Sequence, residues 1–477
     1  MKVLFISTEV QPFMKTGGLA DVSFALPKAL RAQGIDVRII MPKYGDISPN
    51  YTSKTCLLAS FGVAVGWRNQ YCGLEYLNYE DIPIYFVDNE YYFKRPGCYG
   101  YFDDGERFAY FCRAVMESVA HMDDFKPDVL HCNDWHTGMI PLYLKDFYSE
   151  RPEFCGTGSV FTIHNLKYQG VFSPAVLEEL LGLNMGYFTE DKIKFKDGIS
   201  FMKAGIVYAD RITTVSQTYA KEIQQPYYGE ELDGLLRKMS YKLVGITNGI
   251  DYEKNDPRTD PNIAQNFTVR SLNRKVVNKV DLQQSVGLPA NPDIPVVGMI
   301  TRLVRQKGLD LVTCVMEDIL KLDLQFVLLG TGDADYQDFF AYYASAYPGK
   351  IAACIRFDHT LASKIYAGSD LFLMPSLFEP CGLSQMIAMR YGTLPLVRET
   401  GGLKDTVTPY NEYTGEGNGF SFANFNAHEM LNILKYALVQ YDHPEVWKRL
   451  VQNAMHTRFD WEKQSAKYAS LYDSITE

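Results

Sequence analysis

The feature that most constrains the fold is a pattern that occurs twice along the chain. Short runs of apolar, β-branched residues alternate with longer stretches of helical periodicity. The short runs predict buried strands of a parallel sheet. In the first half they cover residues 3–7, 37–41, 129–132, 160–164 and 212–215. In the second half they cover residues 296–300, 326–329, 355–357, 371–374 and 394–397. The chain is therefore expected to form two doubly wound α/β domains.

The helical stretches and their boundaries agree with this prediction. Leu19, Val22, Leu26 and Leu30 recur at helical spacing, and Gly34 stands where a helix would stop. A chain of 477 residues is also too long for one ordinary core. We expect domains at residues 1–250 and 295–456. A proline-rich connection with one short helix would span 251–294, and an amphipathic helix would span 457–477.

Composition excludes several classes of partner. The net charge is −10 and no Lys/Arg-rich run occurs, which argues against a nucleic acid. The nine cysteines are scattered without a Cys-x-x-Cys pair, as is typical of a reducing cytoplasm and not of a zinc site. The apolar run at residues 1–7 is too short for a signal peptide, and no segment has the length needed to span a membrane. Composition does not predict the oligomeric state.

The loop after the first predicted strand could bind an anion. In open parallel sheets, ligands bind outside the carboxyl ends of strands, so two facing sheets would form a cleft lined by such loops. Residues 15–22 read KTGGLADV. Paired glycines let the backbone approach a ligand, the following helix offers N–H groups, and Lys15 offers a charge for phosphate. An ordinary turn with a solvated lysine explains this pattern equally well.

Three loops of the second half have comparable features. Residues 301–308 read TRLVRQKG, so Arg302 and Lys307 could reach one diphosphate, although a solvated basic loop is the commoner explanation. Residues 379–383 read EPCGL and place a carboxylate after a strand. Residues 400–403 read TGGL and repeat the glycine pair. Either of the last two loops could be structural, but the occurrence of both at successive strand ends favours a site.

Three patterns suggest a cofactor or a metal that we do not expect. Residues 330–333 read GTGD, but Asp335 stands where a dinucleotide fingerprint requires its third glycine, so a nicotinamide enzyme is rejected. Asp333 and Asp335 are expected to begin a helix and not to bind a metal. His131, Asp134 and His136 lack a further ligand set, so His131 is expected to be a hydrogen-bonded core histidine. His164, at a strand exit, is well placed to touch a sugar.

Taken together and in this order, these motifs resemble those of the glycogen and starch synthases that use ADP-glucose. The loop at residues 15–22 is the most diagnostic. The other matching residues are 134–136 (DWH), 164–165 (HN), 247–251 (TNGID), 302, 306–308 (QKG), 379–383 and 400–403. The similarity extends from residue 1 to the helix near Trp461. It implies the glycosyltransferase-B fold, with two Rossmann-like domains facing across a cleft and the last helix returning to the first domain.

The resemblance also implies an activity and a site. The activity is retaining, metal-independent transfer of glucose from ADP-glucose to the non-reducing end of an α-1,4-glucan, without a cofactor. The implied catalytic residues are Glu379, His164, Arg302 and Lys307. The implied substrate-binding residues are Lys15, Gly18, Asp134, Asn248, Phe357, Cys381, Gly382, Leu383, Thr400, Gly401 and Gly402. Phe357 would stack on adenine. Leu377 departs from the family, in which many members carry Arg, and this puts a local ion pair in doubt.

The expected chemistry follows from charge. Negative charge grows on ADP as the glycosidic bond breaks, and Lys15, Arg302 and Lys307 would stabilise it. No carboxylate can be identified from the sequence as the nucleophile of a double displacement, so a front-face mechanism is preferred. The alternatives are a retaining transferase that uses UDP-glucose, such as a sucrose-synthase-like enzyme, and a non-catalytic glucan-binding protein.

Overall fold

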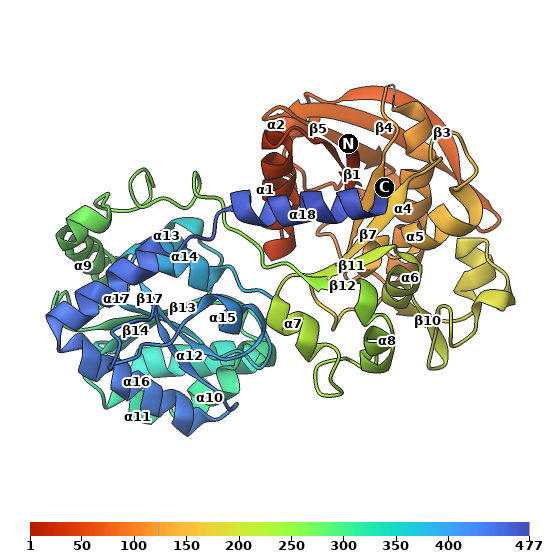
Figure 1. Cartoon of the computed structure of the whole chain (residues 1–477). Coiled ribbons are helices and arrows are strands. Elements are labelled where there is room, and N and C mark those ends of the chain that lie inside the picture. The colour runs from red at the N-terminus through yellow and green to blue at the C-terminus, as the bar shows by residue number, and fades with distance from the viewer. Residues whose placement is uncertain (123, 477) are drawn as a thin grey trace. The chain divides into compact units, whose positions relative to one another are not determined.

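The computed structural model describes residues 1–122 and 124–476, which form two compact units (Figure 1). The first unit is Met1–Asn248 together with the C-terminal residues from Trp461 on, and the second is Gly249–Asp460. Each unit has its own sheet and its own hydrophobic core.

The sheet of the first unit has nine strands, in the order β12-β11-β7-β6-β1-β2-β5-β4-β3. The strands are β1 (Lys2–Ile6), β2 (Asp36–Pro42), β3 (Cys56–Val65), β4 (Arg68–Tyr79), β5 (Ile82–Asp88), β6 (Val129–Asn133), β7 (Gly158–Ile163), β11 (Arg211–Thr214) and β12 (Leu243–Gly245). A separate three-stranded sheet has the order β8-β10-β9, from β8 (Val171–Phe172), β9 (Lys194–Phe195) and β10 (Gly198–Ser200). The five strands predicted in this half all lie in the parallel part of the large sheet.

The antiparallel hairpin β3–β4 at the edge of this sheet was not predicted. Its residues are partly exposed, so it lacks the continuous apolar run from which buried parallel strands were identified. Gly66 makes the turn with a φ of +58°. A Cβ at this position would lie 2.0 Å from the carbonyl oxygen of Glu179, so the turn requires glycine.

The sheet of the second unit has six parallel strands, in the order β15-β14-β13-β16-β17-β18. The strands are β13 (Val296–Ile300), β14 (Gln325–Leu329), β15 (Ile351–Cys354), β16 (Leu371–Met374), β17 (Leu394–Arg398) and β18 (Phe420–Phe422). The predicted strand at residues 355–357 was wrong. Pairing with β14 ends at Cys354, which lies opposite Leu329, so Phe357 lies three positions beyond the strand and is exposed.

Helices connect these strands in both units. Those of the first unit are α1 (Gly18–Ala32), α2 (Pro49–Thr52), α3 (Glu90–Phe93), α4 (Asp104–Ser118), α5 (Met139–Tyr143), α6 (Phe201–Tyr208), α7 (Gln217–Glu222), α8 (Asp233–Lys238) and α18 (Trp461–Thr476). Those of the second unit are α9 (Lys275–Ser285), α10 (Leu309–Cys314), α11 (Met316–Leu320), α12 (Ala334–Ala346), α13 (His359–Gly368), α14 (Ser384–Arg390), α15 (Gly401–Thr406), α16 (Ala427–Tyr441) and α17 (Pro444–His456).

The predicted first helix is confirmed. Its apolar face, which includes Leu19 and Leu26, is buried, and Gly34 ends the segment with a φ of +87°. The last helix, α18, packs against α1 and β7 (Figure 1). The hydroxyl of Tyr472 on α18 lies 2.6 Å from Nδ1 of His131. His131 is buried, and its Nε2 lies 2.6 Å from Oγ1 of Thr162, so the prediction of a hydrogen-bonded core histidine is also confirmed.

Residues 251–294, expected to form a connection, pack into the second unit. Phe267, Leu282 and Leu288 belong to its core. Nζ of Lys279 on α9 lies 2.8 Å from Oδ2 of Asp370, which anchors the helix to the residues that precede β16. The segment is therefore a packed part of the second unit.

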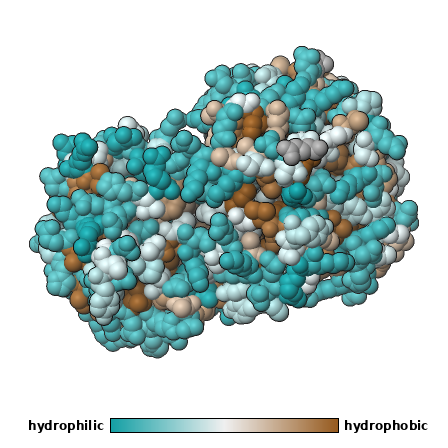
Figure 2. Space-filling view, in the orientation of Figure 1, coloured by the Kyte–Doolittle hydropathy of each residue, from teal (hydrophilic) through white to brown (hydrophobic). Residues whose placement is uncertain are grey.

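Apolar side chains fill the two cores, and hydrophilic residues cover most of the face shown in Figure 2. In the described part of the chain, every helix is too short or too polar to cross a membrane.

Candidate active site

The predicted residues of the first unit lie at the carboxyl ends of three neighbouring strands. Lys15 and Gly18 follow β1, Asp134 follows β6 and His164 follows β7, and these strands are adjacent in the order β7-β6-β1. The connections run from β1 to β2 on one side and return to β6 on the other, so the order reverses between β1 and β6. Such a reversal is where doubly wound sheets bind ligands.

The glycine loop after β1 is open on one side and anchored on the other. A Cβ at Gly17 would have no atom within 4 Å, so the backbone there faces open space. The N–H groups of Thr16 and Gly17 donate to the carboxylate of Glu9, at 2.5 and 3.1 Å. The N–H groups of the first turn of α1 have no partner within the helix. These groups are therefore the ones that could bind an anion.

Lys15 is held by a surface ion pair. Its Nζ lies 2.7 Å from Oδ2 of Asp21, and the two side chains are 31% and 28% exposed. An ion pair exposed to this degree stabilises a protein by only about 0–1 kcal/mol. An incoming diphosphate could therefore redirect Lys15 at little cost.

Asp134 has an unusual backbone conformation and organises the next loop. Its φ of +57° is rare for a residue other than glycine, and such outliers cluster at functional sites. Its Oδ1 accepts hydrogen bonds from the backbone N–H groups of His164, at 2.8 Å, and Asn165, at 3.3 Å. Burial raises the pKa of Asp134 to about 7, the two N–H donors oppose that rise, and the charge of Glu9 adds to it.

His164 is a neutral ring of defined tautomer. The side-chain amide of Asn133 donates from Nδ2 to the carbonyl of Ile6, at 2.9 Å, so its Oδ1 accepts from Nε2 of His164, at 2.8 Å. Nε2 then carries the hydrogen and Nδ1 is an acceptor. Burial lowers the pKa of His164 to about 3, so the ring stays neutral near pH 7. Asn133 was missed by the sequence analysis, although it is the last residue of β6.

In the second unit the predicted residues also follow neighbouring strands. Arg302 and Lys307 follow β13, Glu379 follows β16 and Thr400 follows β17. The strand order reverses between β13 and β16, so Lys307 and Glu379 lie at the second reversal point. Arg302 is exposed.

The structure brings Lys307 and Glu379 into direct contact. Nζ of Lys307 donates to both carboxylate oxygens of Glu379, at 2.9 and 2.7 Å. The hydroxyl of Ser376, which was not predicted, donates to the same carboxylate at 3.0 Å. Glu379 is 6% exposed, so this carboxylate is buried and compensated by one cation and one hydroxyl.

The second glycine pair packs against the backbone of Glu379 and Cys381. A Cβ at Gly401 would lie 1.9 Å from the carbonyl oxygen of Glu379, and one at Gly402 would lie 2.0 Å from that of Cys381. The N–H of Gly402 donates to the Glu379 carbonyl at 3.1 Å. Protein packing therefore requires these glycines, whereas a backbone contact to a ligand stays a prediction.

Further backbone hydrogen bonds position the residues that precede Glu379. The N–H of Leu377 donates to the carbonyl of Gln306, at 2.9 Å, and the carbonyl of Leu377 accepts from the guanidinium of Arg398, at 2.5 Å. Leu377 thus forms these two hydrogen bonds through its backbone, although its side chain differs from that of many relatives. The loop that carries Lys307 and the loop that carries Glu379 form one connected structure.

The remaining predicted residues differ in environment. Asn248, Cys381 and Thr400 are buried, and in the described residues Oδ1 of Asn248 has no hydrogen-bond partner. Gly382 has a φ of +71°, and Leu383 precedes α14. Phe357 is 77% exposed, with its ring 4.6 Å from that of His359.

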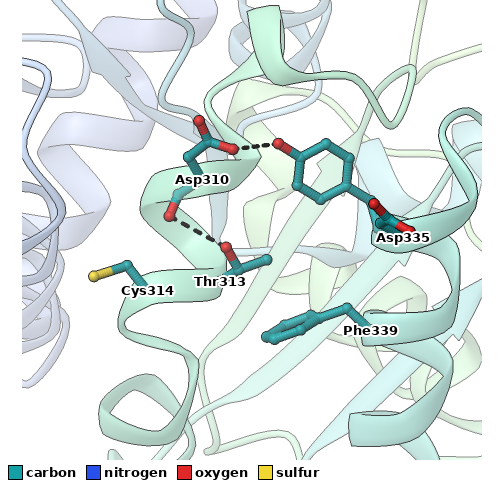
Figure 3. A pocket seen from close by; sticks show the side chains of 6 residues that line it. Asp310, Thr313, Cys314, Asp335 and Phe339 are labelled. Carbon is teal, nitrogen blue, oxygen red and sulfur yellow. Dashed lines mark hydrogen bonds between the residues drawn. The ribbon is translucent and has the colours of Figure 1, made fainter.

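The acidic residues after β14 begin a helix, as predicted. Asp333 precedes α12 and Asp335 lies in its first turn. A pocket of about 410 Å³ lies between α10 and α12 (Figure 3) and is lined by Asp310, Thr313, Cys314, Asp335, Tyr336 and Phe339. Its charged side chains are acidic, so it does not suit a diphosphate. Within residues 1–122 and 124–476, no three His, Cys, Asp or Glu side chains are grouped to hold a metal ion.

Known proteins resemble this chain over its whole length. Residues 2–238 match the family model of the starch synthase catalytic domain, and residues 282–455 match that of glycosyl transferases group 1. The chain is 56% identical to a glycogen synthase of Clostridium acetobutylicum, with all of both chains covered. It is 54% identical to a glycogen synthase of Geobacillus stearothermophilus, with 100% of this chain and 98% of the relative covered.

Solved structures give the same result. The catalytic domain of starch synthase IV from Arabidopsis thaliana, bound to ADP and acarbose, superposes with a TM-score of 0.93 at 34% identity, covering 99% of each chain. A sucrose-phosphate synthase of Thermosynechococcus elongatus has a TM-score of 0.64 at 18% identity over 99% of this chain and 98% of that one, and so shares the fold alone. The two Rossmann-like domains are thus those of the glycosyltransferase-B fold. With full-length identities above 50%, this chain belongs to the family of glycogen and starch synthases.

Proposed function

We propose that this chain is a retaining glucosyltransferase that transfers glucose from ADP-glucose to the non-reducing end of an α-1,4-glucan, in glycogen biosynthesis. One observation carries the proposal. The buried Lys307–Glu379 pair lies at a strand-order reversal in a chain 56% identical, over its whole length, to a glycogen synthase. A glucan-binding protein without catalytic activity would not need a cation beside a carboxylate at that point.

The cations have the role of holding the donor diphosphate. Negative charge develops on ADP as the bond to the anomeric carbon breaks, and fixed positive charge lowers the energy of that state. Arg302 can grip phosphate oxygens bidentately, whereas Lys15 and Lys307 act as point charges. Nζ of Lys307 uses two donors on Glu379 and retains a third for phosphate. The backbone at Gly18, Gly382, Leu383, Gly401 and Gly402 would line the diphosphate.

The transferred glucose would be bound by Glu379, His164, Asp134 and Asn248. An ionised carboxylate has about four lone-pair sites, so Glu379 can accept from sugar hydroxyls in addition to its present donors. Nδ1 of His164 is an acceptor, which suits a sugar hydroxyl. Oδ1 of Asn248 is buried without a partner in the described residues, which favours a ligand donor there.

The remaining predicted residues would contact the adenine and the rest of the substrate, and each domain would bind a different part of it. The exposed ring of Phe357 would stack on adenine, and Cys381 and Thr400 would contact the substrate. Residues 1–250 would bind the acceptor and the sugar, residues 295–456 would bind the nucleotide, and residues 457–477 would complete the first domain. The reaction would need neither metal nor cofactor and would take place in the cytoplasm, which fits nine cysteines without a Cys-x-x-Cys pair.

A nucleotide-sugar screen with glycogen as acceptor tests the proposal. We expect turnover with ADP-glucose, release of ADP, and incorporation of labelled glucose that β-amylase removes again. Faster turnover with UDP-glucose, or transfer to fructose, would favour a sucrose-synthase-like enzyme instead. Binding of labelled glucan without release of any nucleotide would favour the non-catalytic alternative.

A further inference from the structure

Glu9 is a buried carboxylate at the carboxyl end of β1, and the site assigned above does not include it. It is 4% exposed. Its Oε2 accepts from the backbone N–H groups of Thr16 and Gly17, and its Oε1 accepts from the hydroxyls of Thr16, at 2.8 Å, and Tyr99, at 2.9 Å. Four donors thus converge on one carboxylate, and two of them are backbone groups of the glycine loop.

The surrounding residues hold Glu9 itself in place. The hydroxyl of Ser7 donates to the carbonyl of Glu9, at 2.9 Å, and accepts from the hydroxyl of Ser23 on α1, at 2.8 Å. The hydroxyl of Tyr99 also lies 2.7 Å from Oγ1 of Thr8. The carboxylate is therefore fixed relative to β1 and α1. Its hydrogen bonds to Thr16 and Gly17 hold the loop in place in turn.

We propose that Glu9 is a positioning residue for the donor diphosphate. Its carboxylate would hold the loop at residues 15–18 in the conformation in which Lys15, Gly18 and the first turn of α1 meet the diphosphate. This inference rests on the function proposed above. A short loop with paired glycines has many accessible conformations, and two charge-assisted hydrogen bonds to its backbone remove most of them. Binding then costs less conformational entropy.

Because Glu9 accepts hydrogen bonds from four donors, it is not expected to act as a nucleophile or a general base. A nucleophile or general base needs a free lone pair directed at the substrate. Each oxygen of Glu9 already accepts two hydrogen bonds from the protein. Its effect is therefore exerted through the loop.

The conservative variant Glu9→Gln distinguishes these possibilities. The amide oxygen of Gln can keep both bonds to Thr16 and Gly17, while its NH2 faces the hydroxyls of Thr16 and Tyr99, which can reverse and accept. We therefore expect ADP binding within about threefold of wild type in Glu9→Gln, and at least about tenfold weaker in Glu9→Ala. Glu9→Leu fills the same space without accepting hydrogen bonds, and covers the case in which Glu9→Ala does not fold.

Asp210→Ala is the matched control. Oδ2 of Asp210 likewise accepts from a backbone N–H and a hydroxyl, both of Ser159, at 2.8 and 3.0 Å. Asp210 precedes β11, so it lies at the amino ends of the parallel strands, whereas Glu9 lies at their carboxyl ends. Its substitution should lower stability to a similar degree and leave ADP binding unchanged.

The test is the dissociation constant of ADP by titration calorimetry, together with the KM values for ADP-glucose and glycogen. Glu9→Ala should raise the donor KM and leave the glycogen KM unchanged. In a Lys15→Ala background, Glu9→Ala should add less than about threefold, because both changes act on one loop. Independent, multiplicative effects, or equal losses of ADP binding in Glu9→Ala and Asp210→Ala, would overturn the inference. Wild-type protein that neither binds ADP nor turns over would instead overturn the proposed function.

Discussion

Removal of Lys307 should affect stability and turnover by separable amounts. The variant Lys307→Ala takes two of the three side-chain hydrogen bonds from the Glu379 carboxylate and leaves one, from Ser376. The two charged side chains are 18% and 8% exposed, so water can replace the lost partner of the carboxylate only in part. Breaking a buried pair in this way costs about 3–5 kcal/mol, and the residual exposure of Lys307 favours the lower value, about 3 kcal/mol.

A second change should restore stability but not activity. In Lys307→Ala/Glu379→Gln the uncompensated charge is gone, and the amide can still pair with Ser376. We expect the double variant to regain all but about 1 kcal/mol of the loss. Turnover should fall by about 10²–10³ in Lys307→Ala and stay low in the double variant, because the cation on the leaving diphosphate is missing from both.

Scanning calorimetry and an ADP-release assay measure these two effects. For a unit of roughly 200 residues, a loss of about 3 kcal/mol lowers the melting temperature by about 6–12 °C. Equal melting temperatures for wild type, single and double variants would refute the argument from burial. Wild-type turnover in Lys307→Ala would refute the assignment of Lys307 to the diphosphate.

Four further predictions concern other parts of the site. In wild type, kcat/KM should fall as the pH drops through about 7, because protonation of Asp134 weakens its hydrogen bonds to the loop of His164. The pH profile of Asp134→Asn should lack this acidic limb. A flat wild-type profile between pH 5.5 and 8 would contradict the assignment. His164 cannot cause the limb, because its pKa is about 3. Phe357→Ala should raise the KM for ADP-glucose about tenfold, because base stacking contributes about 1–3 kcal/mol, whereas Phe357→Tyr should leave it unchanged. Equal KM values in wild type and Phe357→Ala would rule out stacking. Arg302→Ala should lower kcat/KM by about 10² without lowering the melting temperature, because Arg302 is exposed; an unchanged rate would remove its role. Activity should survive dialysis against EDTA, and a loss that divalent ions restore would point to a metal.

The sequence predicted the strands of the parallel sheets well because such strands are buried on both faces. The run at residues 296–300, for example, is a strand with the predicted bounds. The hairpin β3–β4 was missed because its exposed face interrupts the apolar run, and β15 was misplaced because its apolar run continues past the last paired residue. Hydrophobicity indicates burial, whereas strand pairing decides where a strand ends.

The candidate site was predictable in location but not in its contacts. Parallel strands end at one edge of a sheet, so strand-end residues such as Lys307 and Glu379 were expected to gather there. Their direct pairing depends on β13 and β16 being neighbours, which no local pattern of the sequence reveals. Glu9, Asn133 and Ser376 were missed because their roles are visible only in hydrogen bonds to distant parts of the chain.

The final helix has a consequence for synthesis on the ribosome. Tyr472 supplies a hydrogen bond to His131 in the middle of the first sheet, and Trp461 and Tyr468 are buried in the same core. The N-terminal unit must therefore wait, with part of its interior unfilled, until the last residues have left the exit tunnel, whereas the unit made after it holds all its segments sooner. A released chain that ends at residue 460 should consequently be more sensitive to protease in its first unit than in its second.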